Sequence, residues 1–192
     1  VGGRRSGGRA EWVVVRRAGA GSGVGVSRGR GPAGRGDAVE TAFAEDRTVV
    51  IESAIIGRGV EIAVLEGRGD DRPRTSSVIG EIVISGSGFY DFDAKYLGAS
   101  GVELQLPASV TEAEFAALQR DAVHAFEIAQ CAGLARIAFF LTADGPVLNE
   151  LNTLPGFTPI SMYPRLWEES GLSYTELITE LIELAIERRP AY

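Results

Sequence analysis

The sequence is poor in several residue types that would point to particular classes of protein. Its 192 residues include one cysteine, one histidine and one lysine. Cys131 cannot form a disulfide within the chain, which fits a reducing cytoplasm, and we expect it to pack in the core. We expect His124, within a helical stretch, to be a packing or surface residue rather than a catalytic one.

Long apolar runs are also missing. No run approaches the roughly 20 residues needed to span a bilayer, and the N-terminus lacks the charged-then-apolar pattern of a signal peptide. These features predict a soluble, cytoplasmic protein with no membrane partner. With 192 residues, 45% of them hydrophobic, the chain can bury one good core and a second small one. A net charge of -7 argues against nucleic-acid binding.

Charge is distributed unevenly along the chain. Residues 1–37 contain eight arginines and twelve glycines but only two acidic residues. An Arg-Gly tail that binds nucleic acid would have this charge, but Trp12 is the only aromatic residue there and no regular repeat is present, so we disfavour that function. A second alternative is that this N-terminal stretch is not the natural sequence.

The first half of the chain reads as strands around one helix. A short apolar run, 12–15, predicts a strand that enters a glycine-rich turn at 19–26 and then a second strand, a hairpin that could cover a phosphate. Asp37–Ala44 has helical spacing, with Asp37 as the expected N-cap. Val49–Ile56 and Val60–Leu65 are rich in β-branched residues and predict buried strands.

The second half contains stronger signals. Thr111 and Ser173 each stand three residues before a glutamate, the pattern of a capping box, and an apolar stripe follows each of them. Val78–Ser85 predicts a strand, and Ala135–Leu141 and Val147–Asn152 predict two more, joined by a turn.

The most informative stretch is Asn149–Thr158, which combines an acid, an amide and a Pro-Gly turn. If residues 148–152 form a strand, period-two alternation puts Glu150 and Asn152 on one face, where their oxygens can share a hard cation such as Mg²⁺. Gly156 leaves backbone N–H groups open to an anion. These residues predict a metal and phosphate site.

Together with Gly133–Ile137 before it and Ser161–Pro164 after it, this stretch resembles the C-terminal half of the D-alanine–D-alanine ligases, members of the ATP-grasp superfamily. The resemblance extends from about Val49 to Arg189. It implies an α+β, ATP-grasp fold in which two α+β subdomains clamp ATP. By this resemblance, residues 1–60 would be an incomplete central subdomain with an Arg/Gly-rich start, and residues 61–192 the C-terminal subdomain. The N-terminal substrate domain would be absent.

The resemblance also implies a reaction. Ligases of this family use ATP to form an acyl phosphate on one D-alanine, and the amine of a second D-alanine displaces the phosphate, which supplies a peptidoglycan precursor. ATP and D-alanine are therefore the expected partners, Mg²⁺ or Mn²⁺ the expected cofactor, and a homodimer the state suggested by analogy. Glu150 and Asn152 match the metal ligands, and Arg136 would contact the substrate carboxylate or the transferring phosphate.

Substrate-binding positions follow from the same resemblance. Residues 89–96 look like the mobile loop over the active site, in which Tyr96 would pair with Ser22 and favour an amine over a hydroxyl as the nucleophile. Ser161 and Met162 match the pair that contacts the carboxylate of the second alanine. Gly156 would offer its N–H to a developing oxyanion.

The ATP-binding positions form another set. Glu52 and Ile55 match the adenine hinge, and Lys95 would hold an ATP phosphate. The remaining residues assigned to ATP by the resemblance are Arg16, Phe89 and Phe140.

Several positions depart from the family pattern. Ala138 stands where the family has a further metal-binding aspartate, Gly59 replaces the acid that binds ribose, and Gly23 replaces a second serine. Arg16 replaces a lysine. Because of these changes and the absent domain, we expect this fragment to be inactive. The alternative is a degenerate ATP-grasp protein that binds a nucleotide or a partner without catalysis.

Overall fold

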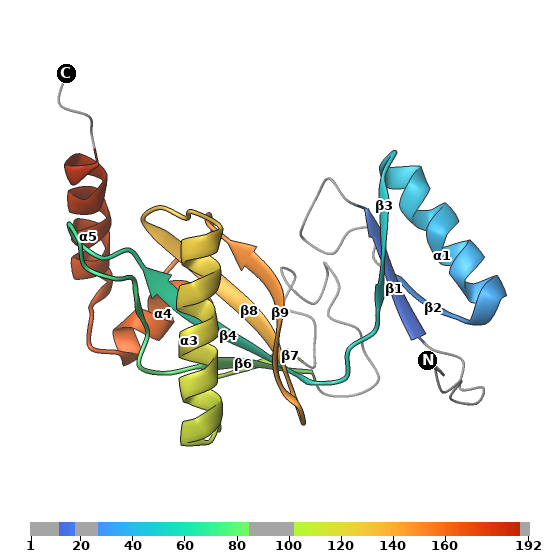
Figure 1. Ribbon diagram of the computed structural model, residues 1–192, viewed down its shortest axis with the longest axis horizontal. Coiled ribbons are helices and arrows are strands. Elements are labelled where there is room, and N and C mark those ends of the chain that lie inside the picture. The colour runs from blue at the N-terminus through green and yellow to red at the C-terminus, as the bar shows by residue number, and fades with distance from the viewer. Residues whose placement is uncertain (1–11, 18–26, 85–101, 189–192) are drawn as a thin grey trace, which may run out of the picture. The chain divides into compact units, whose positions relative to one another are not determined.

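The computed structural model describes residues 12–17, 27–84 and 102–188. Most of the described chain up to Ile55 forms one compact unit, and most of the chain from Ile56 onward forms a second (Figure 1). Each unit consists of a β-sheet with α-helices packed on it, so the α+β prediction is confirmed. Within the described part, no helix is both long enough and apolar enough to cross a membrane.

The first unit is a three-stranded antiparallel sheet with one helix. Its strands lie in the order β2-β1-β3, and β1 pairs with both neighbours, so the predicted hairpin of β1 and β2 is confirmed. The small core consists of Val15 from the central strand and of Ala38 and Ala42 from the helix. The elements are β1 (Trp12–Arg17), β2 (Ser27–Arg30), α1 (Gly31–Glu45) and β3 (Val49–Ser53).

Helix α1 begins six residues before the predicted start, so the assignment of Asp37 as its N-cap is wrong. The Asp37 carbonyl instead accepts a hydrogen bond of 2.9 Å from the Thr41 hydroxyl, within the helix. Glycines make residues 31–36 look like a turn, because glycine has a low helix propensity. A side chain on Gly29 would come within 2.7 Å of the Gly34 carbonyl oxygen, so small residues allow β2 to turn directly into α1.

Strand β3 ends at Ser53 and is not buried as predicted. The side chain of Ile51 is 57% exposed. The reason is that β3 lies at the edge of its sheet, and β-branched residues favour a strand whether or not something covers it. A run of valine and isoleucine therefore identified the strand but not its environment.

The second unit is built on a larger sheet in the order β7-β6-β4-β8-β9, with the short strand β5 paired to β4. Strand β4 is central and buried, as predicted for Val60–Leu65. The predicted strands within 78–85, 135–141 and 147–152 are confirmed as β6, β8 and β9. The strands are β4 (Arg58–Leu65), β5 (Arg74–Thr75), β6 (Gly80–Ile84), β7 (Val102–Gln105), β8 (Leu134–Thr142) and β9 (Gly145–Asn152).

Alternate residues of β4 serve two cores. Val60, Ile62 and Val64 face helix α3 (Glu112–Ile128), where they pack with Leu118, Ala122 and Phe126. Ala63 and Leu65 face the other side, where helix α4 (Met162–Glu169) packs on the sheet and α5 (Tyr174–Glu187) packs on α4 (Figure 1). Each fully buried Leu or Ile contributes about 1.5–3 kcal/mol, so the two cores hold this unit together.

The capping boxes predicted at Thr111 and Ser173 are confirmed. In each box the hydroxyl accepts a hydrogen bond from the glutamate N–H three residues later, and the glutamate carboxylate accepts one from the cap residue's N–H. Helix α4 was not predicted. Pro164 in its first turn obscures the pattern, but a proline is tolerated there because the N–H it lacks would have no partner within the helix.

Candidate functional site

Three rows of cross-strand neighbours on one face of the second sheet bring together the predicted residues of strands β8 and β9. This is the face that α4 covers near Ala63 and Leu65. Along β4, β8 and β9 the rows are Gly59–Phe140–Val147, then Glu61–Ala138–Glu150, then Ala63–Arg136–Asn152. Four predicted residues, Arg136, Phe140, Glu150 and Asn152, therefore share this face.

A β-bulge determines which residues of β9 take part. The register shifts so that Leu148 lies opposite Phe139 while Glu150 lies opposite Ala138, and Asn149 is the extra residue. If Asn149 paired regularly with Ala138 and there were no bulge, Glu150 would lie opposite Ile137, on the α3 face with Leu148. The bulge therefore turns Glu150 and Asn152 toward the site, and Leu151 packs against the α3 core.

Arg136 lies between two carboxylates. Its Nε is 3.3 Å from Glu61 Oε1, and its Nη2 is 3.3 Å from Glu150 Oε1. Both acids belong to the row of Ala138 rather than to Arg136's own row. The guanidinium group therefore leans across the Ala138 methyl group, and Ala138 is buried.

Sequence reasoning missed Glu61. Its side chain is one of the few charged groups in the buried interior, with the residue only 5% exposed. The available signal was a single acid within the otherwise apolar strand 60–65, because a buried carboxylate requires a charged or hydrogen-bonding partner. Arg136 is such a partner, but only the pairing of β4 with β8 identifies it.

Glu150 and Asn152 have the chemistry of a magnesium site. Both are half-buried, and the Asn152 Oδ1 accepts a 3.0 Å hydrogen bond from the Leu154 N–H, which orients the carboxamide. In the described part of the chain, no three His, Cys, Asp or Glu residues are grouped to hold a metal. One carboxylate and one amide still fit Mg²⁺ bound to a nucleotide, because Mg²⁺ commonly takes its remaining ligands from phosphate and water.

The loop after β9 brings Gly156 and Ser161 together. The Ser161 hydroxyl accepts a 3.1 Å hydrogen bond from the Thr158 N–H and lies 2.9 Å from the Thr158 hydroxyl. Ser161 is the N-cap residue of α4, but its side chain makes no capping hydrogen bond. The first N–H groups of α4 are thus the type of donors that bind an anion.

Met162 has its side chain in the core. It packs over Gly80, the cross-strand neighbour of Glu61, and a methyl group added to Gly80 would overlap the Met162 sulfur. This contact brings the start of α4 to the edge of the row that contains Glu61 and Ala138. Because the Met162 side chain is buried, its backbone N–H at the start of the helix is the group that is suited to bind a ligand.

The first unit carries other predicted residues. Glu52 lies in β3 opposite Val14 and is exposed, Ile55 follows β3 and is also exposed, and Arg16 lies in β1 opposite Val50. The remaining predicted site residues, Ser22, Phe89, Lys95 and Tyr96, lie outside the described residues, as does Gly23.

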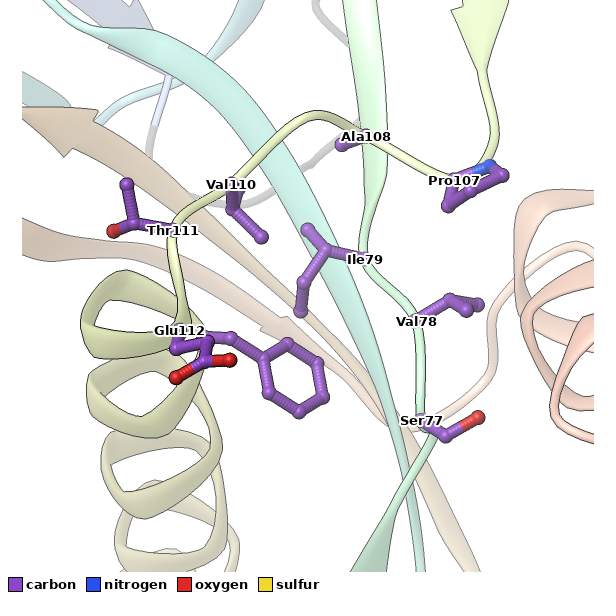
Figure 2. Close-up of a pocket in the computed structure, with 9 residues that line it drawn as sticks. Ser77, Val78, Ile79, Pro107, Ala108, Val110, Thr111 and Glu112 are labelled. Carbon is purple, nitrogen blue, oxygen red and sulfur yellow. The ribbon is translucent and has the colours of Figure 1, made fainter.

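A separate hollow of about 240 Å³ lies near the start of α3. In Figure 2 the side chains of Ile79 and Val110 point toward one another beneath the segment that leads from Pro107 to Thr111. The lining is mainly apolar, and the Thr111 hydroxyl already contacts the Glu114 carboxylate at 2.8 Å. Among the described residues that line this hollow, none is a predicted site residue.

Comparison with known proteins gives one consistent family. A family model described as the D-Ala–D-Ala ligase C-terminus matches residues 12–183. A D-alanine–D-alanine ligase of Pseudarthrobacter chlorophenolicus is 48% identical over 180 residues, which cover 92% of this chain and 47% of that protein. The chain thus spans about half the length of this relative.

Solved structures agree. The D-alanine–D-alanine ligase from Coxiella burnetii matches with a TM-score of 0.76 and 34% identity, over 92% of this chain and 45% of its own. The VanG D-Ala:D-Ser ligase from Enterococcus faecalis matches with a TM-score of 0.78 and 33% identity, over 90% of this chain and 49% of its own.

Proposed function

Since the chain belongs to the D-alanine–D-alanine ligase family and has its ATP-grasp fold, we propose that it is the ATP- and metal-binding portion of a ligase that joins two D-alanines for peptidoglycan synthesis. The observation that carries this proposal is the arrangement of Arg136, Glu150 and Asn152 on one sheet face, beside the Gly156–Ser161 loop. Because ATP and peptidoglycan precursors are made inside the cell, we place the reaction in the cytoplasm.

Glu150 and Asn152 are proposed to hold Mg²⁺ or Mn²⁺ at the phosphates of ATP. When bound, such a cation neutralises the charge that develops during phosphoryl transfer. Arg136 would bind the substrate carboxylate or the transferring phosphate through its guanidinium fork. This places positive charge from the protein beside the metal site.

The start of α4 is proposed to bind the carboxylate of the second alanine. The uncapped helix N-terminus presents the N–H of Met162, and the Ser161 hydroxyl lies beside it. A helix N-terminus favours negative charge through its dipole and its unpaired N–H groups. Gly156, next to Ser161, would donate its N–H to the oxyanion formed when the amine attacks.

Several further residues, most of them outside the second sheet, are also proposed to bind the substrates, by the family resemblance. Glu52 and Ile55 would contact adenine, Arg16 and Lys95 the phosphates, and Phe89 and Phe140 the remainder of ATP. Tyr96 and Ser22 would pair over the second alanine. On this proposal, residues 1–60 correspond to the central ATP-grasp subdomain and residues 61–192 to the C-terminal one.

Titration calorimetry of Mg-ATP into the chain tests the nucleotide site, with Mg-GTP as the comparison. We expect saturable, adenine-selective binding that Glu150→Gln weakens about tenfold or more, the equivalent of about 1.4 kcal/mol. Glu169→Gln, an exposed acid of α4, is the matched control and should leave the affinity unchanged. Absence of binding by a folded sample would contradict the proposal.

A second function is favoured by Ala138 and Gly59. In that case the chain is a degenerate ATP-grasp protein that binds nucleotide without catalysis. A β-carbon added to Gly59 would meet no atom within 4 Å, so there is room for a side chain to begin there. We expect the 192-residue chain alone to form no dipeptide. Activity in a full-length ligase that appears only with Ala138→Asp and Gly59→Glu would support this second function.

A further inference from the structure

Glu61 is a buried acid that the proposed reaction does not use. It lies in the middle of the central strand β4, and the residue is 5% exposed. Transfer of an ionised carboxylate from water into an apolar interior is costly unless it is paired, so such a group requires a partner. The partner here is Arg136, whose Nε lies 3.3 Å from Glu61 Oε1, so the two groups form an ion pair without hydrogen-bond geometry at Nε.

The two acids that contact Arg136 differ in their surroundings. Glu61 is almost fully buried, whereas the Glu150 side chain is 36% exposed and is the proposed metal ligand. If Glu150 turns toward a cation, its contact with Arg136 weakens. Glu61 lies on the side of Ala138 opposite to Glu150 and is not a proposed metal ligand. Its contact with the Arg136 Nε is therefore retained when Glu150 binds a cation.

We propose that Glu61 is a positioning residue that holds the Arg136 guanidinium across Ala138. It would keep the guanidinium in the orientation that binds a phosphate or carboxylate when Glu150 binds a metal. The contacts with Glu61 and Glu150 use Nε and Nη2 of Arg136. Neither contact uses Nη1, which can donate to the ligand. This inference rests on the proposed function, because Arg136 needs positioning only if it binds a phosphate or a carboxylate.

The small side chain at position 138 is part of this arrangement. Ala138 lies directly between Glu61 and Glu150 in the register of the sheet, and cross-strand Cβ atoms are about 4.5–5.5 Å apart. An aspartate there would add a third negative charge to the row and compete for the guanidinium. With alanine at position 138, the carboxylates that contact Arg136 in this row are those of Glu61 and Glu150.

A double-mutant cycle tests whether Glu61 acts through Arg136. Mg-ATP affinity is measured by calorimetry for the natural chain, Glu61→Gln, Arg136→Ala and the double variant. We expect Glu61→Gln to weaken binding about five- to tenfold and the double variant to bind no more weakly than Arg136→Ala. Additive losses in the double variant would overturn the proposal. Glu61→Asp, which keeps the charge on a shorter side chain, should recover part of the affinity.

The matched control is Glu81→Gln, on the opposite face of the same sheet. Glu81 is also buried and pairs with an arginine, since Arg58 Nε donates to its Oε1 at 2.9 Å. We expect Glu81→Gln to lower the midpoint of thermal unfolding without changing Mg-ATP affinity. An equal loss of affinity in this variant would mean that both effects are general consequences of a weakened sheet, and would overturn the positioning role.

A second measurement does not depend on nucleotide binding. In ¹⁵N NMR spectra of the chain, the Nε–H signal of Arg136, assigned by its loss in Arg136→Ala, should move in Glu61→Gln and keep its position in Glu81→Gln. If the natural chain binds no Mg-ATP but the signal moves, the proposed function fails and the Glu61–Arg136 contact stands. An unmoved signal overturns the inference.

Discussion

Gly156 and Ser161 lie so close together that a β-carbon on Gly156 would be 3.1 Å from the Ser161 hydroxyl oxygen. Such a distance is shorter than ordinary van der Waals contact, so a side chain at 156 would push the hydroxyl away. A methyl group at position 156 would therefore have to displace the Ser161 hydroxyl by a few tenths of an ångström. Gly156 lies in the Pro-Gly turn that suggested an anion site from sequence, and its missing side chain leaves room for the hydroxyl of Ser161, the N-cap residue of α4.

The first prediction is that Gly156→Ala weakens binding at the start of α4 with little effect on stability. The added methyl group displaces Ser161, whereas the surrounding loop is mostly exposed and can adjust. Titration with D-alanyl-D-alanine, which carries the carboxylate proposed to bind there, should show an affinity about tenfold lower, or about 1.4 kcal/mol.

Gly171→Ala is the control for this change. Gly171 follows α4 at a φ of +87°, a conformation that is unfavourable for alanine by about 1 kcal/mol or more. This variant should have a lower unfolding midpoint and an unchanged affinity. If Gly156→Ala also only lowered stability, Ser161 would have no part in binding.

A second prediction compares two neighbours on α5. Leu177 is 0% exposed and belongs to the core beneath α4, whereas Ile178 is 36% exposed. Leu177→Ala should lower the free energy of unfolding by about 2–5 kcal/mol, because it leaves a cavity. Ile178→Ala should cost clearly less, since about a third of this residue is already in water. Urea unfolding of both variants provides the comparison, and equal losses would mean that α5 is packed through a different face.

The third prediction concerns acid sensitivity. The pKa of Glu176 is lowered, first because its carboxylate accepts a hydrogen bond from the Ser173 hydroxyl and then because it accepts one from the Ser173 N–H. A carboxyl with a lowered pKa stabilises the folded state above its ordinary value of 4.5, and this stabilisation is lost as the pH falls through the folded-state value. The stability of the protein should therefore decline from about pH 5 downward.

The variant Ser173→Ala distinguishes the contribution of Glu176 to the pH dependence of stability from that of the other carboxylates. It should lower stability by about 1 kcal/mol near pH 7 and make the decline below pH 5 shallower, because Glu176 loses the hydroxyl that lowers its pKa. Thr179→Ala is the matched control on the same helix, since the Thr179 hydroxyl bonds the Thr175 carbonyl and no acid. Unfolding midpoints between pH 3 and 7 provide the test, and parallel profiles for natural protein and Ser173→Ala would contradict it.

Sequence patterns predicted the parts of the fold that depend on local chemistry. The capping boxes at Thr111 and Ser173 and the apolar strand β4 were identified because a few neighbouring residues determine them. The start of α1 and the environment of β3 were predicted incorrectly, because they depend on which other elements pack there. Helix propensity is a weak guide where tertiary contacts decide, and the Gly29–Gly34 approach is such a contact.

The same holds for the candidate site: local features were predicted correctly, and features that depend on strand pairing were not. Alternation correctly placed Glu150 and Asn152 on one face, since only two residues of strand are needed. The bulge at Asn149, which decides that this face is the one with Arg136, has no signal in a single sequence. Glu61 was missed for a similar reason, because its partner is 75 positions away in the chain and only the register of β4 and β8 brings them together.

The last prediction is that Ala138→Asp converts a two-residue metal site into a three-residue one. Position 138 is directly opposite Glu150 and next to the row of Asn152, so a carboxylate there adds an oxygen ligand beside the other two. Each added carboxylate strengthens binding of a hard divalent cation. We expect Mn²⁺, followed by electron paramagnetic resonance, to bind at least about tenfold more tightly, or about 1.4 kcal/mol.

Ala138→Asn is the matched control, because asparagine has the same size without the charge. It should tighten Mn²⁺ binding much less than aspartate does. The gain should also disappear in Ala138→Asp combined with Glu150→Gln, since the new ligand alone would not hold the metal. If that double variant kept the full gain, the added aspartate would bind Mn²⁺ without Glu150, and the proposed metal site on β9 would be wrong.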